Sequence, residues 1–156
     1  MEGTTIQLSE KQKELIQKLG VSLEQFGLTP AEARISGLLL VSGETQLTFD
    51  EIKDSLGLSK SAVSNAINKL LLLGHVEYVT KHGDRKRYFR NNIDRWSSKM
   101  IESFNQTVSL NNVFKEVLAN RPGSTEDFNN HLKDLISFLD FLTKNVAALH
   151  EEWQKK

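Results

Sequence analysis

The chain has 156 residues with 20 Lys/Arg and 20 Asp/Glu, so its formal net charge is zero, and it contains no cysteine. The length fits one domain with an attached helical element for assembly. The lack of cysteine excludes disulfides, thiolate zinc sites and cysteine redox chemistry. No apolar run approaches the roughly 20 residues of a membrane span, and no signal-like pattern begins the chain, so we expect a cytoplasmic protein without a membrane partner.

Two helices are predicted in the acidic first part of the chain. Ser9 with Gln12 matches a capping box that opens a helix ending at Gly27. Apolar side chains recur on one face of this helix at helical spacing: Leu15, Ile16, Leu19, Leu23 and Phe26.

The second helix has a stronger start. Thr29, Pro30 and Glu32 combine an N-cap, a first-turn proline and a reciprocal carboxylate. We expect this helix to end at Gly43, and a short strand near residues 46–47 to pair with a later hairpin.

A helix–turn–helix pattern follows. Thr48 with Glu51 forms a third capping box, Gly57 suits the left-handed residue of a tight turn, and Ser59 caps a helix that ends at Gly74. The inward face of this second helix is small and apolar: Ala62, Val63, Ala66, Ile67, Leu70 and Leu71. Its outward face carries hydroxyl, amide and ammonium groups that can bond to base edges or phosphates: Lys60, Ser61, Ser64, Asn65, Asn68 and Lys69.

A basic β-hairpin comes next, with strands predicted over residues 75–80 and 85–90 and a turn over residues 81–84. Apolar anchors lie on both strands, and the pattern does not decide which of them face inward: Val76, Tyr78, Tyr88 and Phe89. We expect Asp84 to orient an arginine by ion pairing. The hairpin is strongly cationic: Lys81, Arg85, Lys86, Arg87 and Arg90.

The positive charge of the chain is concentrated in this segment. Residues 59–95 hold eight Lys/Arg against three Asp/Glu, whereas residues 1–58 hold five against nine. A helix–turn–helix followed by a basic ribbon is an arrangement for holding duplex DNA, with the helix in the major groove and the ribbon on the backbone or in the minor groove. A polar helix face or a charge run alone is usually just solvated, but here the two occur in the order that DNA binding requires. The predicted DNA contacts are Ser59, Lys60, Ser61, Ser64, Asn65, Lys69, Lys81, His82, Arg85, Lys86 and Arg87.

Three runs carry a family resemblance: AEARISGLLL, LSKSAVSNAINKLLLLGHVEYV and GDRKRYF. With them, residues 29–90 resemble the winged helix–turn–helix of the MarR superfamily, and more narrowly its GbsR-type branch. MarR-type wings usually carry Asp-x-Arg, and Lys86 at the third position fits the GbsR-type variant better. The resemblance implies a transcriptional regulator with one helix before the motif and long helices after it. It also implies a small-molecule effector, which the sequence does not identify.

The last third of the chain predicts assembly. A helix over about residues 125–153 follows another over about 93–120, with Arg-Pro-Gly-Ser between them. So long an apolar helix exceeds what one small winged domain can cover, and we predict a homodimer whose two recognition helices meet an inverted repeat with half-sites about 10 base pairs apart. The dimerisation residues alternate by four and three in an a/d repeat: Phe128, Leu132, Leu135, Leu139, Leu142, Val146, Leu149 and Trp153.

The predicted fold is therefore mainly α with a small β wing, a winged helix–turn–helix domain plus long C-terminal dimerisation helices. Residues 1–28 form an N-terminal helix packing with the dimer helices, residues 29–91 the DNA-binding domain, and residues 92–156 the dimerisation region. One alternative is a winged-helix protein-interaction or scaffold module that pairs through its heptad helix, although such a module has no need of the basic wing. Another is a regulator of the PadR-like plan.

No catalytic residues, cofactor or metal site are expected. The four histidines are scattered, and the chain has no Gly-rich phosphate loop, nucleophile elbow or readable carboxylate pair. Five aromatic side chains of the C-terminal part are favoured as core over a cage for a cation: Trp96, Phe104, Phe138, Phe141 and Trp153. The operator, the effector and the choice between repression and activation stay open.

Overall fold

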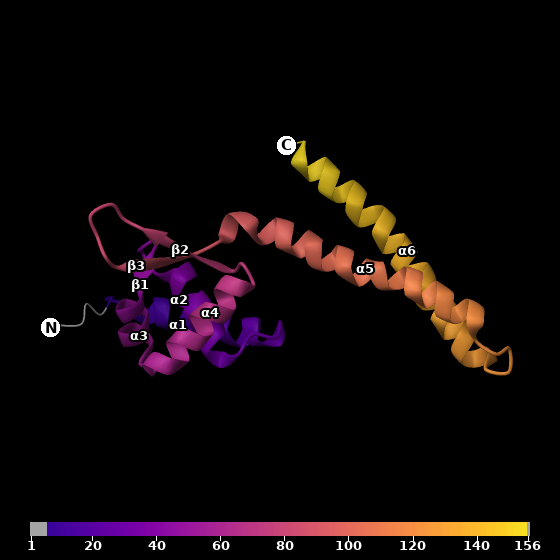
Figure 1. Cartoon of the computed structure of the whole chain (residues 1–156), viewed down its shortest axis with the longest axis horizontal. Helices are drawn as coiled ribbons and strands as arrows, with labels where there is room; N and C mark the ends of the chain where they lie inside the picture. The colour runs from indigo at the N-terminus through magenta and orange to yellow at the C-terminus, as the bar shows by residue number, and fades with distance from the viewer. Residues whose placement is uncertain (1–5, 156) are drawn as a thin grey trace. The chain divides into compact units, whose positions relative to one another are not determined.

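The computed structural model describes residues 6–155 and confirms a mainly helical fold with a small three-stranded sheet (Figure 1). The chain divides into two compact units at Trp96/Ser97. The elements of the first unit are α1 (Glu10–Gln25), α2 (Pro30–Val41), β1 (Leu47–Thr48), α3 (Phe49–Leu56), α4 (Lys60–Leu72), β2 (Val76–Thr80), β3 (Arg87–Asn91) and a short 3-10 turn (Ile93–Arg95). The second unit contains α5 (Trp96–Asn120), whose first residue is the last of the first unit, and α6 (Glu126–Gln154).

Local side-chain bonds set the starts of the first three helices. All three predicted capping boxes are present. In each, the N-cap hydroxyl accepts from the backbone amide of the third helical residue, and the side chain of that residue accepts from the N-cap amide. The bonds from the N-cap amides measure 2.9 Å for Ser9–Gln12, 2.9 Å for Thr29–Glu32 and 2.7 Å for Thr48–Glu51. At its other end α2 stops earlier than expected, at Val41, with Ser42 rather than Gly43 as its C-cap.

The core of the first unit joins helices α2, α3 and α4 to the inner face of the sheet. Its fully buried apolar side chains include Ile35, Leu38, Leu47, Ile52, Val63, Leu70 and Val76. Helix α1 packs on α2 within this unit and adds Ile16 to the core. The expected packing of α1 on the dimer helices stays a prediction.

Phe26, placed on the apolar face of the first helix by its spacing, is 85% exposed. Helix α1 ends at Gln25, and Phe26 is its C-cap with non-helical backbone angles. The helical period no longer applies there, so the prediction that Phe26 joins the apolar face is wrong.

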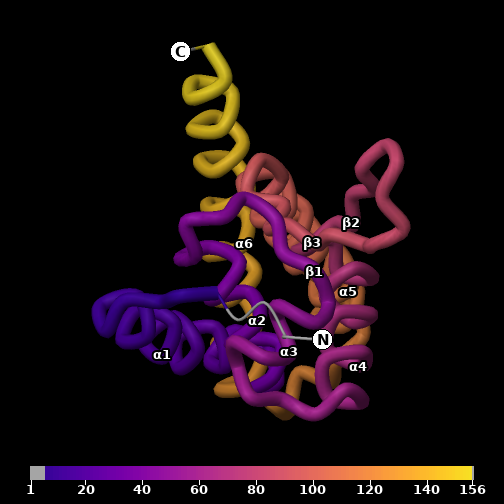
Figure 2. Tube along the Cα trace, turned by 90° about the vertical axis from the view of Figure 1, so that its left-hand side faces the viewer, coloured from indigo at the N-terminus to yellow at the C-terminus, as the bar shows by residue number. Residues whose placement is uncertain are grey.

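The sheet has the strand order β1-β3-β2, with β3 in the middle and both pairings antiparallel (Figure 2). The short strand expected near residues 46–47 is confirmed, since Leu47 pairs with Phe89. Val76 and Phe89 face the core, whereas Tyr78 is 58% exposed and Tyr88 is half-buried. Strand β3 begins at Arg87 instead of residue 85, which leaves a loop of residues 81–86 between β2 and β3.

The second unit is a helical hairpin. Near the turn Arg121 Nε donates to Asn129 Oδ1 at 2.8 Å, and the Arg121 guanidinium lies 4.1 Å from the centre of the Phe128 ring. A buried amide, Asn111 Nδ2 of α5, donates to Asp140 Oδ1 of α6 at 2.8 Å, and Lys115 Nζ reaches the same oxygen at 2.8 Å. The two helices lie close together near the turn and diverge toward the C-terminal end of α6 (Figure 1).

No helix in residues 6–155 is both long enough and apolar enough to cross a membrane.

Candidate nucleic-acid interface

Helix α4 presents a polar face to solvent. Gly57 enters the turn before it with φ 61°, as a left-handed residue must, and Ser59 Oγ accepts from Ala62 N at 3.2 Å to cap the helix. The predicted base-reading side chains lie opposite the buried row that starts at Val63. Ser64 is half-buried, and the following are exposed: Ser59, Lys60, Ser61, Asn65 and Lys69.

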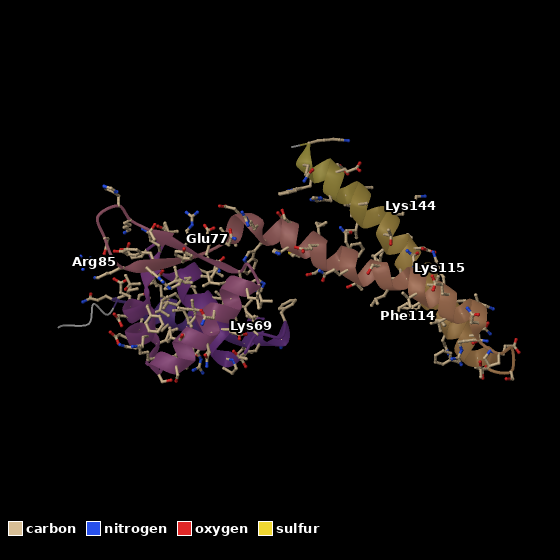
Figure 3. The ribbon with its side chains drawn as sticks, viewed as in Figure 1. Lys69, Glu77, Arg85, Phe114, Lys115 and Lys144 are labelled. Carbon is tan, nitrogen blue, oxygen red and sulfur yellow. The ribbon has the colours of Figure 1, made fainter. Side chains whose placement is uncertain are left out.

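The loop between β2 and β3 carries the exposed cations of the wing; Figure 3 shows Arg85 on this loop and Lys69 on α4. Asp84 N donates to Lys81 O at 3.1 Å, and Gly83 has φ 81°, so the loop turns sharply at its tip. The predicted phosphate-holding residues are all exposed, four of them on the loop and Arg87 at the start of β3: Lys81, His82, Arg85, Lys86 and Arg87.

The expectation that Asp84 orients an arginine by ion pairing is wrong. Its Oδ1 accepts from Lys86 N at 2.9 Å and its Oδ2 accepts from Tyr88 Oη at 2.7 Å. The Lys86 amide, the Tyr88 hydroxyl and the nearby Lys86 ammonium hold the pKa of the Asp84 carboxyl below its ordinary value. The same carboxylate raises the pKa of the Tyr88 phenol.

Two of the wing cations are engaged within the hairpin. Arg90 Nε donates to Glu77 Oε1 across β2 and β3. Lys81 Nζ lies 4.0 Å above the centre of the Tyr88 ring, a cation–π contact. The exposed side chains of Arg85, Lys86 and Arg87 are therefore the principal positive surface of the loop.

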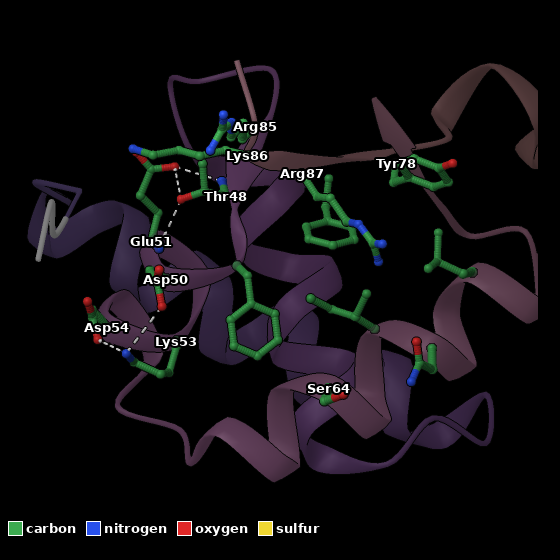
Figure 4. A pocket seen from close by; sticks show the side chains of 15 residues that line it. Thr48, Asp50, Glu51, Lys53, Asp54, Ser64, Tyr78, Arg85, Lys86 and Arg87 are labelled. Carbon is green, nitrogen blue, oxygen red and sulfur yellow. Dashed lines mark hydrogen bonds and ion pairs between the residues drawn. The ribbon is translucent and has the colours of Figure 1, made fainter. Parts of the chain in front are cut away.

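A hollow of about 880 Å³ lies between α3, α4 and the wing (Figure 4). Arg85, Lys86 and Arg87 line it from the wing, and Ser64 lines it from α4, so the structure brings these four predicted residues together. The other predicted DNA contacts do not line it. Its apolar lining includes Phe49, Ile67, Leu71 and Phe89.

The hollow also adds residues that the predicted site omitted. Asn68 lines it one helical turn after Ser64, so the spacing on the α4 face already contained the signal. Lys53 of α3 lines it as well, bound to Asp54 at 3.1 Å and Asp50 at 3.5 Å, and these carboxylates raise the pKa of Lys53. The α3 side of the hollow is therefore net negative, since Asp50, Glu51 and Asp54 face it with Lys53 as their single cation, while its wing side is positive.

The comparison with protein families concerns this same part of the chain, because residues 26–87 match the model of the MarR family. This segment is therefore similar to the MarR family. Two curated relatives agree over nearly the full length. The HTH-type transcriptional regulator MmpR5 of Mycobacterium tuberculosis is 24% identical over 89% of this chain and 86% of its own length. The HTH-type transcriptional repressor OpcR of Bacillus subtilis is 23% identical over 97% and 91%.

A solved structure described as a transcriptional regulator supports the same fold beyond the matched domain. It covers 91% of this chain and 99% of its own at a TM-score of 0.65 and 21% sequence identity. The family match and the two curated relatives, not this structure, support a DNA-binding transcriptional regulator rather than an enzyme.

The heptad residues of α6 are only half covered within the second unit. Every second member of the row faces α5: Leu132 and Leu139 are buried, and Val146 is half-buried. Of the alternate members, Phe128, Leu135 and Leu149 are exposed and Leu142 is half-buried. Trp153 follows Val146 in the first set but is exposed, so the alternation ends before the last turns of α6. A single neighbouring helix covers one stripe of an a/d row, which explains the alternation.

The second unit also contains a smaller hollow of about 260 Å³ between α5 and α6, lined by Met100, Ile101, Val146, Leu149 and Trp153 together with Ser97 and His150. Of the aromatic side chains considered for a cation cage, only Trp153 lines it, and Phe138 and Phe141 are exposed. Among residues 6–155, no three or more His, Asp or Glu side chains are grouped so that they could hold a metal ion.

Proposed function

We propose that this regulator binds an inverted-repeat operator as a homodimer, with α4 reading base edges and the wing holding the adjacent backbone. The observation that carries the proposal is the hollow where Ser64 of α4 meets Arg85, Lys86 and Arg87 of the wing. A polar helix face and a cationic loop on either side of one concave surface match a sugar–phosphate strand passing between two grooves.

The proposed contacts divide into reading and anchoring. Ser61, Ser64 and Asn65 lie on the outward face of α4, and hydroxyl and amide groups can distinguish base edges in the major groove. Lys60 and Lys69 flank them and would meet phosphates. On the wing, four loop residues and the first residue of β3 would hold the backbone and the minor groove: Lys81, His82, Arg85, Lys86 and Arg87.

The homodimer is supported by apolar surface that the second unit leaves exposed. On α6 the exposed large side chains include Phe128, Leu135 and Phe138, and on α5 they include Leu110, Val113 and Val117 at a spacing of three and four. Contiguous apolar stripes of this kind mark protein interfaces. A second copy of the hairpin would cover both stripes and complete a helical bundle with a two-fold axis.

We further infer that the protein is a repressor of the GbsR-type branch. Lys86 in the Asp-x-Lys wing supports the branch, and the Bacillus subtilis relative that spans nearly the whole chain is described as a transcriptional repressor. A small ligand that alters the separation of the two α4 helices would then change operator affinity.

The test is a titration of fluorescent duplexes from the upstream region of the gene, and of scrambled duplexes, at several salt concentrations. We expect tight, preferential binding whose log K falls against log salt with a slope of about −5 or steeper. The Asn65→Ala variant should lose preference for the operator by about 1–3 kcal/mol. The Lys86→Ala variant should weaken binding to both duplexes and make the slope shallower by about 1.

The matched control is Lys144→Ala, which removes the same charge from an exposed position on α6 and should leave DNA binding unchanged. An equal, sequence-independent loss in Asn65→Ala and Lys86→Ala would refute the division between reading and anchoring. No wild-type binding to either duplex at low salt would refute the operator proposal itself.

A further inference from the structure

The wing loop is closed by its own side chains, and Tyr88 is at the centre of them. Its hydroxyl donates to Asp84 Oδ2 at 2.7 Å, and its ring face receives Lys81 Nζ at 4.0 Å. Asp84 uses its other oxygen to accept from Lys86 N at 2.9 Å. One tyrosine therefore touches the first residue after β2, Lys81, and a residue in the middle of the loop, Asp84.

Tyr88 itself is held firmly. It lies in β3, the middle strand, opposite Val79 of β2 and Thr48 of β1. Since strands on both sides fix the backbone of β3, the hydroxyl group projects from a rigid base toward the loop. Because the Tyr88 ring is half-buried and its backbone is in a central strand, its contacts can restrict the motion of the exposed loop.

The segment enclosed by these contacts is the cationic one. The last backbone pair of the hairpin is Thr80 with Arg87, so sheet pairing does not order residues 81–86. The Asp84–Tyr88 bond spans Arg85, Lys86 and Arg87, and the Asp84–Lys86 bond fixes the amide in the middle of that run. Every backbone position from which these three side chains extend is therefore constrained.

We propose that Tyr88, with Asp84 and Lys81, is a positioning residue for DNA binding: it holds the loop in its binding shape before DNA arrives. The proposal rests on the proposed function, in which Arg85, Lys86 and Arg87 contact the backbone. A loop ordered in advance loses less conformational entropy on binding, and the saving appears as affinity. Because the contacts are to the loop and not to DNA, the gain is the same for every DNA sequence.

The protonation states favour this arrangement at neutral pH. The hydroxyl of Tyr88 must keep its proton to donate it, and Asp84 must be ionised to accept two bonds. The lowered pKa of Asp84 and the raised pKa of Tyr88 both stabilise that pair of states. The stabilisation of the loop by Asp84 is fully present when the pH is above the ordinary aspartate pKa. It is lost as the pH falls through the lowered pKa of Asp84 in the folded protein.

The test compares Tyr88→Phe with Thr107→Val in the full-length protein. The Tyr88 change removes one hydroxyl and keeps the ring that packs on the sheet and faces Lys81. The Thr107 change also removes one hydroxyl, from an exposed residue of α5 that bonds back to Ser103 O at 3.1 Å and lies outside the hollow. Asp84→Asn is a second variant, placed in an exposed loop where it cannot disturb the core.

For Tyr88→Phe we expect about threefold to tenfold weaker binding to operator and scrambled duplexes alike, the worth of one net hydrogen bond. The salt slope should not change, since no charge is lost. Backbone order parameters of residues 82–86 in the free protein should fall from about 0.85 toward 0.6. The pKa of Asp84 should rise toward its ordinary value. Asp84→Asn should lower the order parameters of residues 82–86 in the same way, and Thr107→Val should match the wild type in both affinity and order.

Unchanged affinity in Tyr88→Phe, or unchanged order parameters in residues 82–86, would overturn the proposal. A loss confined to the operator duplex would also overturn it, because Tyr88 would then act in reading bases. Absence of wild-type binding would reject the proposed function instead, and the order parameters would still decide whether Tyr88 holds the loop.

Discussion

Side chains such as Ile35, Leu38 and Ile52 are wholly buried in the first unit, whereas in the second unit the best-covered apolar residues, such as Leu139, keep some exposure. The first unit builds its core from four helices and a sheet, all within one chain. The second unit has two helices, and large apolar side chains lie exposed on both. The comparison indicates that the first unit is complete by itself, while the second needs another surface to cover it.

The largest expected effect is on the first unit. Ile52→Ala removes a fully buried side chain of α3 and should lower the free energy of unfolding by about 2–5 kcal/mol. Denaturant unfolding followed at two protein concentrations measures it. Because the core belongs to one chain, the loss should be the same at both concentrations. A loss that depended on concentration would mean that this unit, too, is completed by a second copy.

An intermediate effect is expected on assembly. Phe138→Ala truncates an aromatic side chain that is 55% exposed on α6, and an aromatic interface anchor of this kind is worth about 2 kcal/mol. The dimer dissociation constant from sedimentation equilibrium should then rise about 30-fold.

Leu72→Ala is the control, because Leu72 is a still more exposed large apolar side chain, at the end of α4 in the first unit. It should leave the dimer dissociation constant unchanged. Equal increases of the dimer dissociation constant in the two variants would contradict the inference that only the second unit needs a partner surface.

The smallest effect concerns a helix cap. Thr48 Oγ1 accepts from Glu51 N at 3.3 Å, so Thr48→Ala should cost about 1 kcal/mol of unfolding free energy. The same substitution at Thr143, inside α6, should change it by less than about 0.5 kcal/mol. There the hydroxyl only bonds back to Leu139 O, a carbonyl that the helix already satisfies. Thermal unfolding of both variants measures the difference, and a larger loss at Thr143 would contradict it.

The features that the sequence predicted well are those decided by neighbouring residues. The three capping boxes and the left-handed Gly57 involve groups within one helical turn of each other, so their spacing is sufficient evidence. The alternation of the heptad row was equally visible, and it correctly located α6.

The features that it missed depend on contacts between distant segments. Which of Val76, Tyr78, Tyr88 and Phe89 face the core depends on how the hairpin lies on α2 and α4, and alternation alone gives two equal answers. The partner of Asp84 was misjudged because three cations lie nearby in sequence, whereas the turn at Gly83 aims the carboxylate at a tyrosine. The site residues themselves stay predictions until DNA binding is measured.

The buried amide of Asn111 has a consequence for the alignment of α5 and α6. An apolar row that repeats every seven residues is degenerate, because sliding one helix by a heptad recreates nearly the same apolar contacts. The bond from Asn111 to Asp140 breaks that degeneracy. In any slipped alignment the amide would be buried against hydrocarbon without its partner, at a cost of about 1–3 kcal/mol. The hydrogen bond of Asn111 therefore fixes the register of α5 against α6.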